Sequence, residues 1–194
     1  KGSSAGCGNS GANNQRIKIS EISNEWNKTD DKRGLLTIVL TKWDAEDKIY
    51  MGSKLDFTKG FDPDITEHAL EFNTDSKLND GYGFQRINDK KYLLYIDSYA
   101  ASYNYTDLMA TNGLILKTQS INNGLEKPYS NKLWYFDMLE PLNSEKTNYE
   151  TAHYIEINSN FDNLFDIIEW CKENDGLCKQ IAKNSYEFYQ KYIN

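Results

Sequence analysis

Apolar runs and alternating apolar positions mark the segments of this chain that should form strands. Residues 35–40, 91–97 and 114–117 are rich in consecutive apolar residues, a pattern typical of strands buried on both faces in a parallel sheet. Residues 153–157 alternate between apolar and polar side chains, which also indicates a strand. These four segments are the predicted strands of the fold.

Apolar residues recur every three or four positions in segments between and after these strands, as they do on one face of a helix. The spacing predicts helices over residues 15–26 and 103–111, a short helix within 133–139, and two closing helices over 161–171 and 181–192. Asn112 and Gly113 end the second helix, and Asp175 and Gly176 separate the closing pair. The alternation of strands and helices predicts an α/β, Rossmann-like domain with a mostly parallel sheet.

The bulk composition adds constraints on size and partners. The chain has 194 residues, of which 39% are hydrophobic and 26% charged, so we expect one globular domain over residues 1–194. The formal net charge of −7 argues against a nucleic-acid partner, because a general nucleic-acid surface needs clustered Lys and Arg. No apolar run approaches the roughly 20 residues of a membrane span, and no signal peptide opens the chain. We therefore expect a soluble segment that binds any phosphate ligand locally.

The first residue and the cysteines also bear on what the chain is. It begins at Lys1, without Met and on a glycine-rich turn, so we expect that an upstream part of the protein is missing. Its cysteines are Cys7, Cys171 and Cys178, which form no CxxC pair, and only two histidines are present. A zinc site needs about four converging ligands. The sequence therefore predicts no metal site and indicates no disulfide.

A glycine-rich segment near the start suggests a first function. Gly6, Gly8 and Gly11 fit the GxGxxG pattern, and Asp30 and Asp31 follow at the distance of the acid that binds the ribose of NAD. That fingerprint needs a strand before the first glycine, and only five residues precede Gly6 here. A nicotinamide-dependent oxidoreductase domain is therefore a distant alternative, and an ordinary flexible loop is another.

Two predicted strand-to-helix turns favour a phosphate ligand of a more general kind. Residues 1–16 and 97–104 both lie where the carboxyl ends of parallel strands are expected, and ligands bind at that edge in open α/β sheets. Small residues leave backbone N–H groups open there, and a helix N-terminus favours a bound anion. Arg16 would add a charged clamp, although a solvated surface arginine is an equal alternative. Ser102 would similarly be either part of such a site or a plain helix cap.

Several segments, in their order and spacing, resemble the family of protein O-glucosyltransferases and fungal capsule-associated xylosyltransferases. The similarity is strongest after residue 91 and patchy between residues 25 and 85. The segments that carry it are residues 1–8, 14–18 and 91–105, Leu139-Glu140-Pro141, His153-Tyr154-Ile155, and residues 164–170, 174–175 and 181–184.

The resemblance implies a GT-B fold of two Rossmann-like lobes, of which this chain would be the second. Such enzymes transfer a sugar, here of the glucose or xylose class, from a UDP-sugar to a protein or glycan hydroxyl. The transfer inverts the anomeric centre and requires no metal or other cofactor. The catalytic base would lie in the first lobe, in cis or in trans, so no catalytic residue is expected here. The residues that should bind the donor are Ser3, Ser4 and Arg16 at the UDP moiety, and Ala100, Ala101, Ser102 and Asn104 around the diphosphate.

Two positions depart from the family pattern. Lys1 replaces an arginine in the first turn, and Asn104 replaces the arginine that neutralises the leaving diphosphate. Asn104 carries no charge, so a degenerate, non-catalytic GT-B-like binding module is an alternative to an active transferase lobe. Members of the family act in the secretory pathway. Asn104 also begins a glycosylation sequon, and a glycan there would block the donor pocket, which favours a cytosolic or viral-factory setting.

Overall fold

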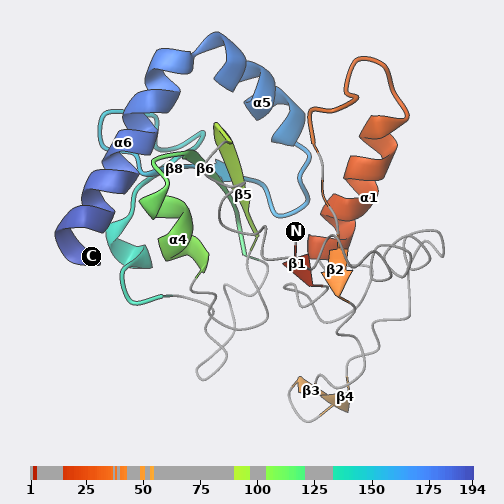
Figure 1. Ribbon diagram of the computed structural model, residues 1–194, viewed down its shortest axis with the longest axis horizontal. Helices are drawn as coiled ribbons and strands as arrows, with labels where there is room; N and C mark the ends of the chain where they lie inside the picture. The colour runs from red at the N-terminus through yellow and green to blue at the C-terminus, as the bar shows by residue number, and fades with distance from the viewer. Residues whose placement is uncertain are drawn as a thin grey trace. The chain divides into compact units, whose positions relative to one another are not determined.

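The computed structural model describes residues 2–3, 15–36, 38, 40–42, 49–50, 53–54, 90–96, 104–120 and 133–194 (Figure 1). Contacts within the chain divide it into two compact units, Lys1–Tyr82 and Gly83–Asn194. The expectation of a single domain over all 194 residues stays a prediction.

The first unit contains a strand, a helix and a second strand that is parallel to the first. Strand β1 (Gly2–Ser3) pairs in parallel with β2 (Leu40–Lys42), and helix α1 (Gln15–Asn27) lies between them in the sequence. Strands β3 (Ile49–Tyr50) and β4 (Ser53–Lys54) form a separate antiparallel pair. The order β1, α1, β2 is therefore a short βαβ unit.

Helix α1 confirms the predicted helix over residues 15–26, whereas the strand predicted over residues 35–40 starts late. The buried hydroxyl of Ser23 donates a hydrogen bond of 3.1 Å to the carbonyl of Leu36 and accepts one of 3.0 Å from the N–H of Ile38. These backbone groups bond to the helix instead of to a neighbouring strand. Of the predicted residues, only Leu40 lies in β2, while residues 37 and 39 lie outside the described part.

The second unit is built on four strands that are all parallel, which confirms the predicted α/β, Rossmann-like fold. Strands β5 (Tyr92–Tyr95), β6 (Leu114–Thr118), β7 (Pro141–Leu142) and β8 (Tyr154–Ile157) lie in the order β5-β6-β8-β7. Strand β7 was not predicted. It is a two-residue edge strand that begins with proline, which lacks an N–H and is tolerated at such edges.

In the described part of this unit, three helices and one 3₁₀ turn accompany the sheet. They are α4 (Asn104–Ala110), η3 (Phe136–Met138), α5 (Leu164–Glu173) and α6 (Asp175–Tyr192). After α4, Asn112 takes the left-handed conformation with φ of 57°, as its predicted role after a helix end requires. At Gly113 a Cβ atom would lie 2.8 Å from the side chain of Leu93, so this turn needs glycine to approach β5 closely.

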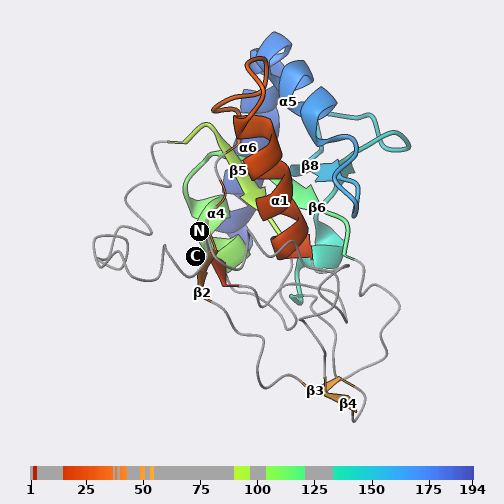
Figure 2. The same ribbon diagram turned by 90° about the vertical axis from the view of Figure 1, so that its right-hand side faces the viewer.

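The closing helices differ from the prediction at both of their starts. Phe161 is buried but precedes α5 in a left-handed conformation with φ of 66°, so it lies outside the helix. Asp175 and Gly176 belong to the first turn of α6, and the single residue Asn174 separates the helices. The Asn174 carbonyl accepts the N–H of Cys178 at 3.0 Å, while its side-chain amide donates to the Trp170 carbonyl at 2.9 Å. The bend between α5 and α6 lies at the top of Figures 1 and 2.

Two buried thiols pack where α5 and α6 meet. Cys171 and Cys178 are both free, and the Cys178 Sγ lies 3.7 Å from the Cys171 carbonyl oxygen. The hydrogen bond with the Cys178 thiol, together with burial, raises the pKa of the Cys171 thiol. Tyr92 on β5 donates its hydroxyl to the same carbonyl at 3.2 Å. The cysteines of this unit therefore act as small packed side chains between strand and helices.

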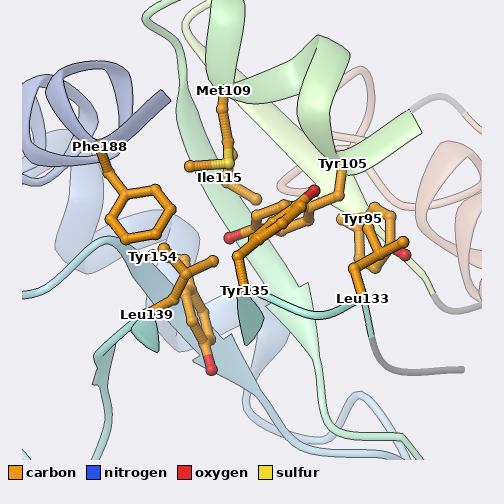
Figure 3. Packing of buried hydrophobic residues seen from close by; sticks show 9 residues of the cluster. All are labelled: Tyr95, Tyr105, Met109, Ile115, Leu133, Tyr135, Leu139, Tyr154 and Phe188. Atoms are coloured by element: carbon orange, nitrogen blue, oxygen red, sulfur yellow. The ribbon is translucent and has the colours of Figure 1, made fainter. Parts of the chain in front are cut away.

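An aromatic cluster forms a hydrophobic core of the second unit (Figure 3). Tyr105 on α4 is fully buried at its centre, with its ring 4.8 Å from Tyr95 and 5.0 Å from Phe136, both in edge-on contacts. The buried members of the cluster are Tyr95, Tyr105, Met109, Ile115, Leu133, Tyr135, Leu139, Tyr154 and Phe188. This packing fixes α4 at the end of β5.

Asn184 on α6 should contribute strongly to stability. Its side-chain amide faces the carbonyl oxygens of Tyr149, Glu150 and Ala152 at 3.4, 2.9 and 2.8 Å. We expect Asn184→Ala to lower the free energy of unfolding by about 1–3 kcal/mol, because those acceptors lose their donor. Urea unfolding measures the change. Gln180→Ala, which removes only a bond to the Asn184 side chain, is the matched control, and equal losses in both variants would contradict the expectation.

Candidate functional site

The predicted donor-binding residues fall in both units of the chain. Ser3 lies in β1, and Arg16 is the second residue of α1, where it is partly buried. Asn104 is the exposed first residue of α4. The remaining predicted residues lie outside the described part of the chain, namely Ser4, Ala100, Ala101 and Ser102. That these residues form one site therefore stays a prediction.

The glycine-rich segment has a structural context that the sequence analysis did not expect. Strand β1 precedes Gly6, and α1 begins at Gln15, shortly after Gly11. The expectation that no strand leads into these glycines is therefore wrong. A connection from the carboxyl end of a parallel strand to a helix suits a phosphate ligand of several kinds, because backbone N–H groups converge there. Residues 4–14 of this connection lie outside the described part of the chain, and the pattern does not select NAD over other phosphate ligands.

Residues that begin α4 are held by the aromatic cluster. Tyr105 is fully buried, and the hydroxyls of Thr106 and Tyr135 are hydrogen-bonded at 2.7 Å. Burial raises the pKa of Tyr135, so its hydroxyl stays protonated at neutral pH. Asn104, by contrast, is exposed. The first residue of α4 therefore presents a neutral amide to solvent on a rigid support.

Polar and aromatic side chains form a row across the carboxyl edge of the sheet. In the parallel register Tyr95 of β5 lies opposite Lys117 of β6, and Lys117 lies opposite Glu156 of β8. Register partners of parallel strands point to the same face. Carboxyl ends of parallel strands are where ligands bind in open α/β sheets. The row Tyr95, Lys117 and Glu156 is therefore a candidate site.

The carboxylate of Glu156, at one end of this row, accepts hydrogen bonds from two neutral amides. The Glu156 Oε2 accepts hydrogen bonds from the side-chain amides of Gln119 at 3.2 Å and Asn143 at 2.7 Å. Gln119 follows β6, and Asn143 follows β7. The sequence analysis missed all of these residues. The signal was a polar residue at or just after the end of each predicted strand, but register decides which of them meet.

Lys117 is the charged centre of the row. Its ammonium lies 5.3 Å from the ring centroid of Phe136, 5.7 Å from that of Tyr154 and 6.0 Å from that of Tyr95. It also donates a hydrogen bond of 3.3 Å to the Thr118 carbonyl. Cation–π contacts of this kind hold an ammonium group without a carboxylate partner.

Two segments that carry the family resemblance lie side by side in the sheet. Strand β7 follows Glu140 and pairs with the start of β8, and the Glu140 N–H donates a 3.0 Å hydrogen bond to the His153 Nδ1. The His153 N–H in turn donates to the Glu140 carbonyl at 2.7 Å. Burial lowers the pKa of His153, against the opposing charge of Glu140. The imidazole is therefore neutral at pH 7, with Nδ1 as an acceptor.

The described part of the chain contains no group of three or more His, Cys, Asp or Glu side chains that could hold a metal ion. Within that part, too, no helix combines the length and the hydrophobicity needed to cross a membrane.

Comparison with known proteins places the chain among longer proteins. No family model matches it. Uncharacterized protein 035R of Invertebrate iridescent virus 3 is 23% identical over 194 residues, all of this chain and 15% of that protein. Uncharacterized protein 179R of Invertebrate iridescent virus 6 is 27% identical over 203 residues, with the same coverage of 100% and 15%. The chain thus spans about a seventh of the length of these relatives.

A third comparison concerns an enzyme. Human protein O-glucosyltransferase 3 is 33% identical over 101 residues, which are 52% of this chain and 16% of that protein. Half of the chain is glycosyltransferase-like. The mouse protein of the same name gives 32% identity over the same length.

Acidification should destabilise the second unit through His153. The unfolded chain takes up a proton near the ordinary pKa of 6.5, whereas the folded state resists it because the pKa is lowered. Stability should therefore fall as the pH drops through 6.5 towards the folded pKa. Asn at this position offers an acceptor for the Glu140 N–H without titrating, so His153→Asn should flatten this dependence. Urea unfolding between pH 7.5 and about 5 tests it, and an unchanged slope would refute the role of His153.

Proposed function

We propose that this chain is the donor-binding lobe of an inverting GT-B glycosyltransferase that uses a UDP-sugar of the glucose or xylose class. The observation that carries the proposal is the glycosyltransferase-like match over half of a chain whose second unit has an all-parallel sheet. Fold alone would not carry it, because Rossmann-like folds serve many functions.

The βαβ unit at the start of the chain supports the proposed place of the donor. In this proposal the UDP moiety is contacted by Ser3 in β1, by the next residue in the sequence, Ser4, and by Arg16 in the first turn of α1. Residues Ala100, Ala101 and Ser102, between β5 and α4, hold the diphosphate through their backbone. Backbone N–H groups before a helix suit phosphate oxygens, because they point at the anion.

The proposed reaction divides its roles between two lobes. The carboxylate of an acidic residue in the first lobe, in cis or in trans, acts as the base and takes the proton of a protein or glycan hydroxyl, whose oxygen attacks the anomeric carbon of the donor from the side opposite UDP. The bond from the anomeric carbon to the diphosphate oxygen breaks, and UDP leaves with the electron pair. This chain binds the donor and stabilises the negative charge that develops on the leaving diphosphate.

Asn104 gives a reason to consider a second function. It is an exposed, neutral residue at the start of α4, where the family resemblance places an arginine. A degenerate lobe that keeps the fold without donor chemistry would act as a binding module. An NAD-binding oxidoreductase domain is a more distant candidate, favoured by the GxGxxG pattern of Gly6, Gly8 and Gly11 and by the strand that precedes it.

Nucleotide titration separates these functions. We expect the intact protein to bind UDP and UDP-glucose or UDP-xylose in isothermal calorimetry and to bind NAD no better than a non-cognate nucleotide. Chelation with EDTA should leave donor binding unchanged, because protein groups alone hold the diphosphate in the proposed site. Absence of UDP binding at millimolar concentration would favour the non-catalytic binding module, and selective NAD binding would indicate the oxidoreductase.

Arg16→Ala tests the proposed UDP contact in the first unit. We expect UDP affinity to fall about tenfold or more, because a charge-assisted hydrogen bond to a phosphate oxygen is lost. Arg33→Ala is the matched control, since Arg33 is exposed and pairs with Asp30 at 3.1 Å beyond the end of α1. If both variants bind UDP as the wild type does, Arg16 is not part of the site.

A further inference from the structure

Lys117 lies near the carboxyl end of an inner strand of the sheet. It is the penultimate residue of the central strand β6, and its side chain is only partly exposed at the carboxyl edge of the sheet. Three aromatic rings, from Tyr95, Phe136 and Tyr154, surround its ammonium at 5.3–6.0 Å. Strand, 3₁₀ turn and neighbouring strands thus cooperate to hold one positive charge at this edge.

This ammonium has no carboxylate partner in the part of the chain that the structure describes. None of the ion pairs there involves Lys117. The carboxylate next to it in register, Glu156, is engaged by the amides of Gln119 and Asn143. Lys117 uses one donor on the Thr118 carbonyl at 3.3 Å, so donors remain for another acceptor. A partly buried ammonium without a counter-charge is suited to an anion supplied by a ligand.

The register also determines which side of Lys117 that anion approaches. Tyr95, the last residue of β5, lies directly opposite Lys117, and the chain continues from β5 towards Asn104 at the start of α4. On the β8 side of Lys117, the negative charge of Glu156 repels an anion. On the side towards β5 the register partner of Lys117 is the neutral Tyr95, while α4, which begins at Asn104, carries Asp107 in its first turn. An anion therefore approaches Lys117 from the side of β5, away from Glu156.

We propose that Lys117 supplies the positive charge that neutralises the diphosphate of the donor nucleotide, at the edge of the sheet where Asn104 carries none. This inference rests on the proposed donor-binding function. The ammonium donates to a diphosphate oxygen while the aromatic rings fix its position. The charge that the resemblance expects at the start of α4 comes instead from the adjacent strand.

The experiment compares three probes on the intact protein by calorimetry: UDP, uridine and inorganic pyrophosphate. Lys117→Met keeps the unbranched apolar stem among the rings and removes the charge. We expect it to weaken UDP and pyrophosphate binding about tenfold or more and to leave uridine binding unchanged, while Lys117→Arg retains most of the UDP affinity. Raising the salt concentration should weaken UDP binding less in Lys117→Met than in the wild type.

Lys91→Met provides the matched control. Lys91 lies at the amino end of β5, at the opposite edge of the sheet, where it is exposed and pairs with Asp175. We expect this variant to bind UDP as the wild type does. Thermal unfolding of both variants shows whether either loss is structural. The proposal is overturned if Lys117→Met loses UDP affinity only in parallel with its folding stability and Lys117→Arg loses the UDP affinity as well.

The possible outcomes separate the two proposals. Wild type and Lys117→Met binding UDP equally well overturns the role of Lys117 and leaves the donor-binding function intact. Pyrophosphate binding that depends on Lys117, without preference for UDP, supports the anion site and overturns the donor-binding function. Failure of the wild type to bind either UDP or pyrophosphate overturns both.

Discussion

Parallel pairing of four strands is the constraint on which the second unit depends. Once β5, β6, β8 and β7 pair in parallel, the inner strands β6 and β8 have a strand neighbour on both sides, and all four carboxyl ends lie at one edge of the sheet. Polar residues at the strand ends then meet there, although they are far apart in the sequence. Lys117, Glu156 and Asn143 come from three different strands or strand ends for this reason.

The aromatic cluster converts this arrangement into a fixed site. Tyr105 anchors α4 through contacts with Tyr95 on β5 and Phe136 on η3, and the same two rings also flank the Lys117 ammonium. Packing and charge placement therefore share side chains. A change that loosens the core would also move the charge, because aromatic packing in a dense interior leaves little room for independent motion.

The proposed function rests on a glycosyltransferase match over half of the chain. The fold alone is common to many activities. The matches to proteins of two iridescent viruses cover the whole of this chain but only 15% of the length of each viral protein. Donor binding by this segment and catalysis by another are thus proposals about a longer protein. In these proposals Asn104 supplies no charge to a leaving diphosphate, and Lys117 supplies it instead.

Local patterns were sufficient for most of the secondary structure. Apolar runs predicted β5, β6 and β8, helical spacing predicted α1 and α4, and the sequence of Asn112 and Gly113 predicted the end of α4. The errors lie where a distant partner decides. The Ser23 hydroxyl hydrogen-bonds to the backbone of Leu36 and Ile38, so these residues do not begin β2 as predicted. Asn174 alone separates α5 from α6, where Asp175 and Gly176 were the expected break.

The sequence by itself determined the α/β alternation, because spacing of apolar residues reflects which faces are buried. Among the predicted site residues it placed Arg16 in the first turn of α1 and Asn104 at the start of α4. Only the tertiary structure decided that β7 joins the sheet, that Glu140 and His153 bond to one another, and that Lys117 is surrounded by three rings. Register between strands sets these contacts, and register depends on pairings between residues that no local pattern relates.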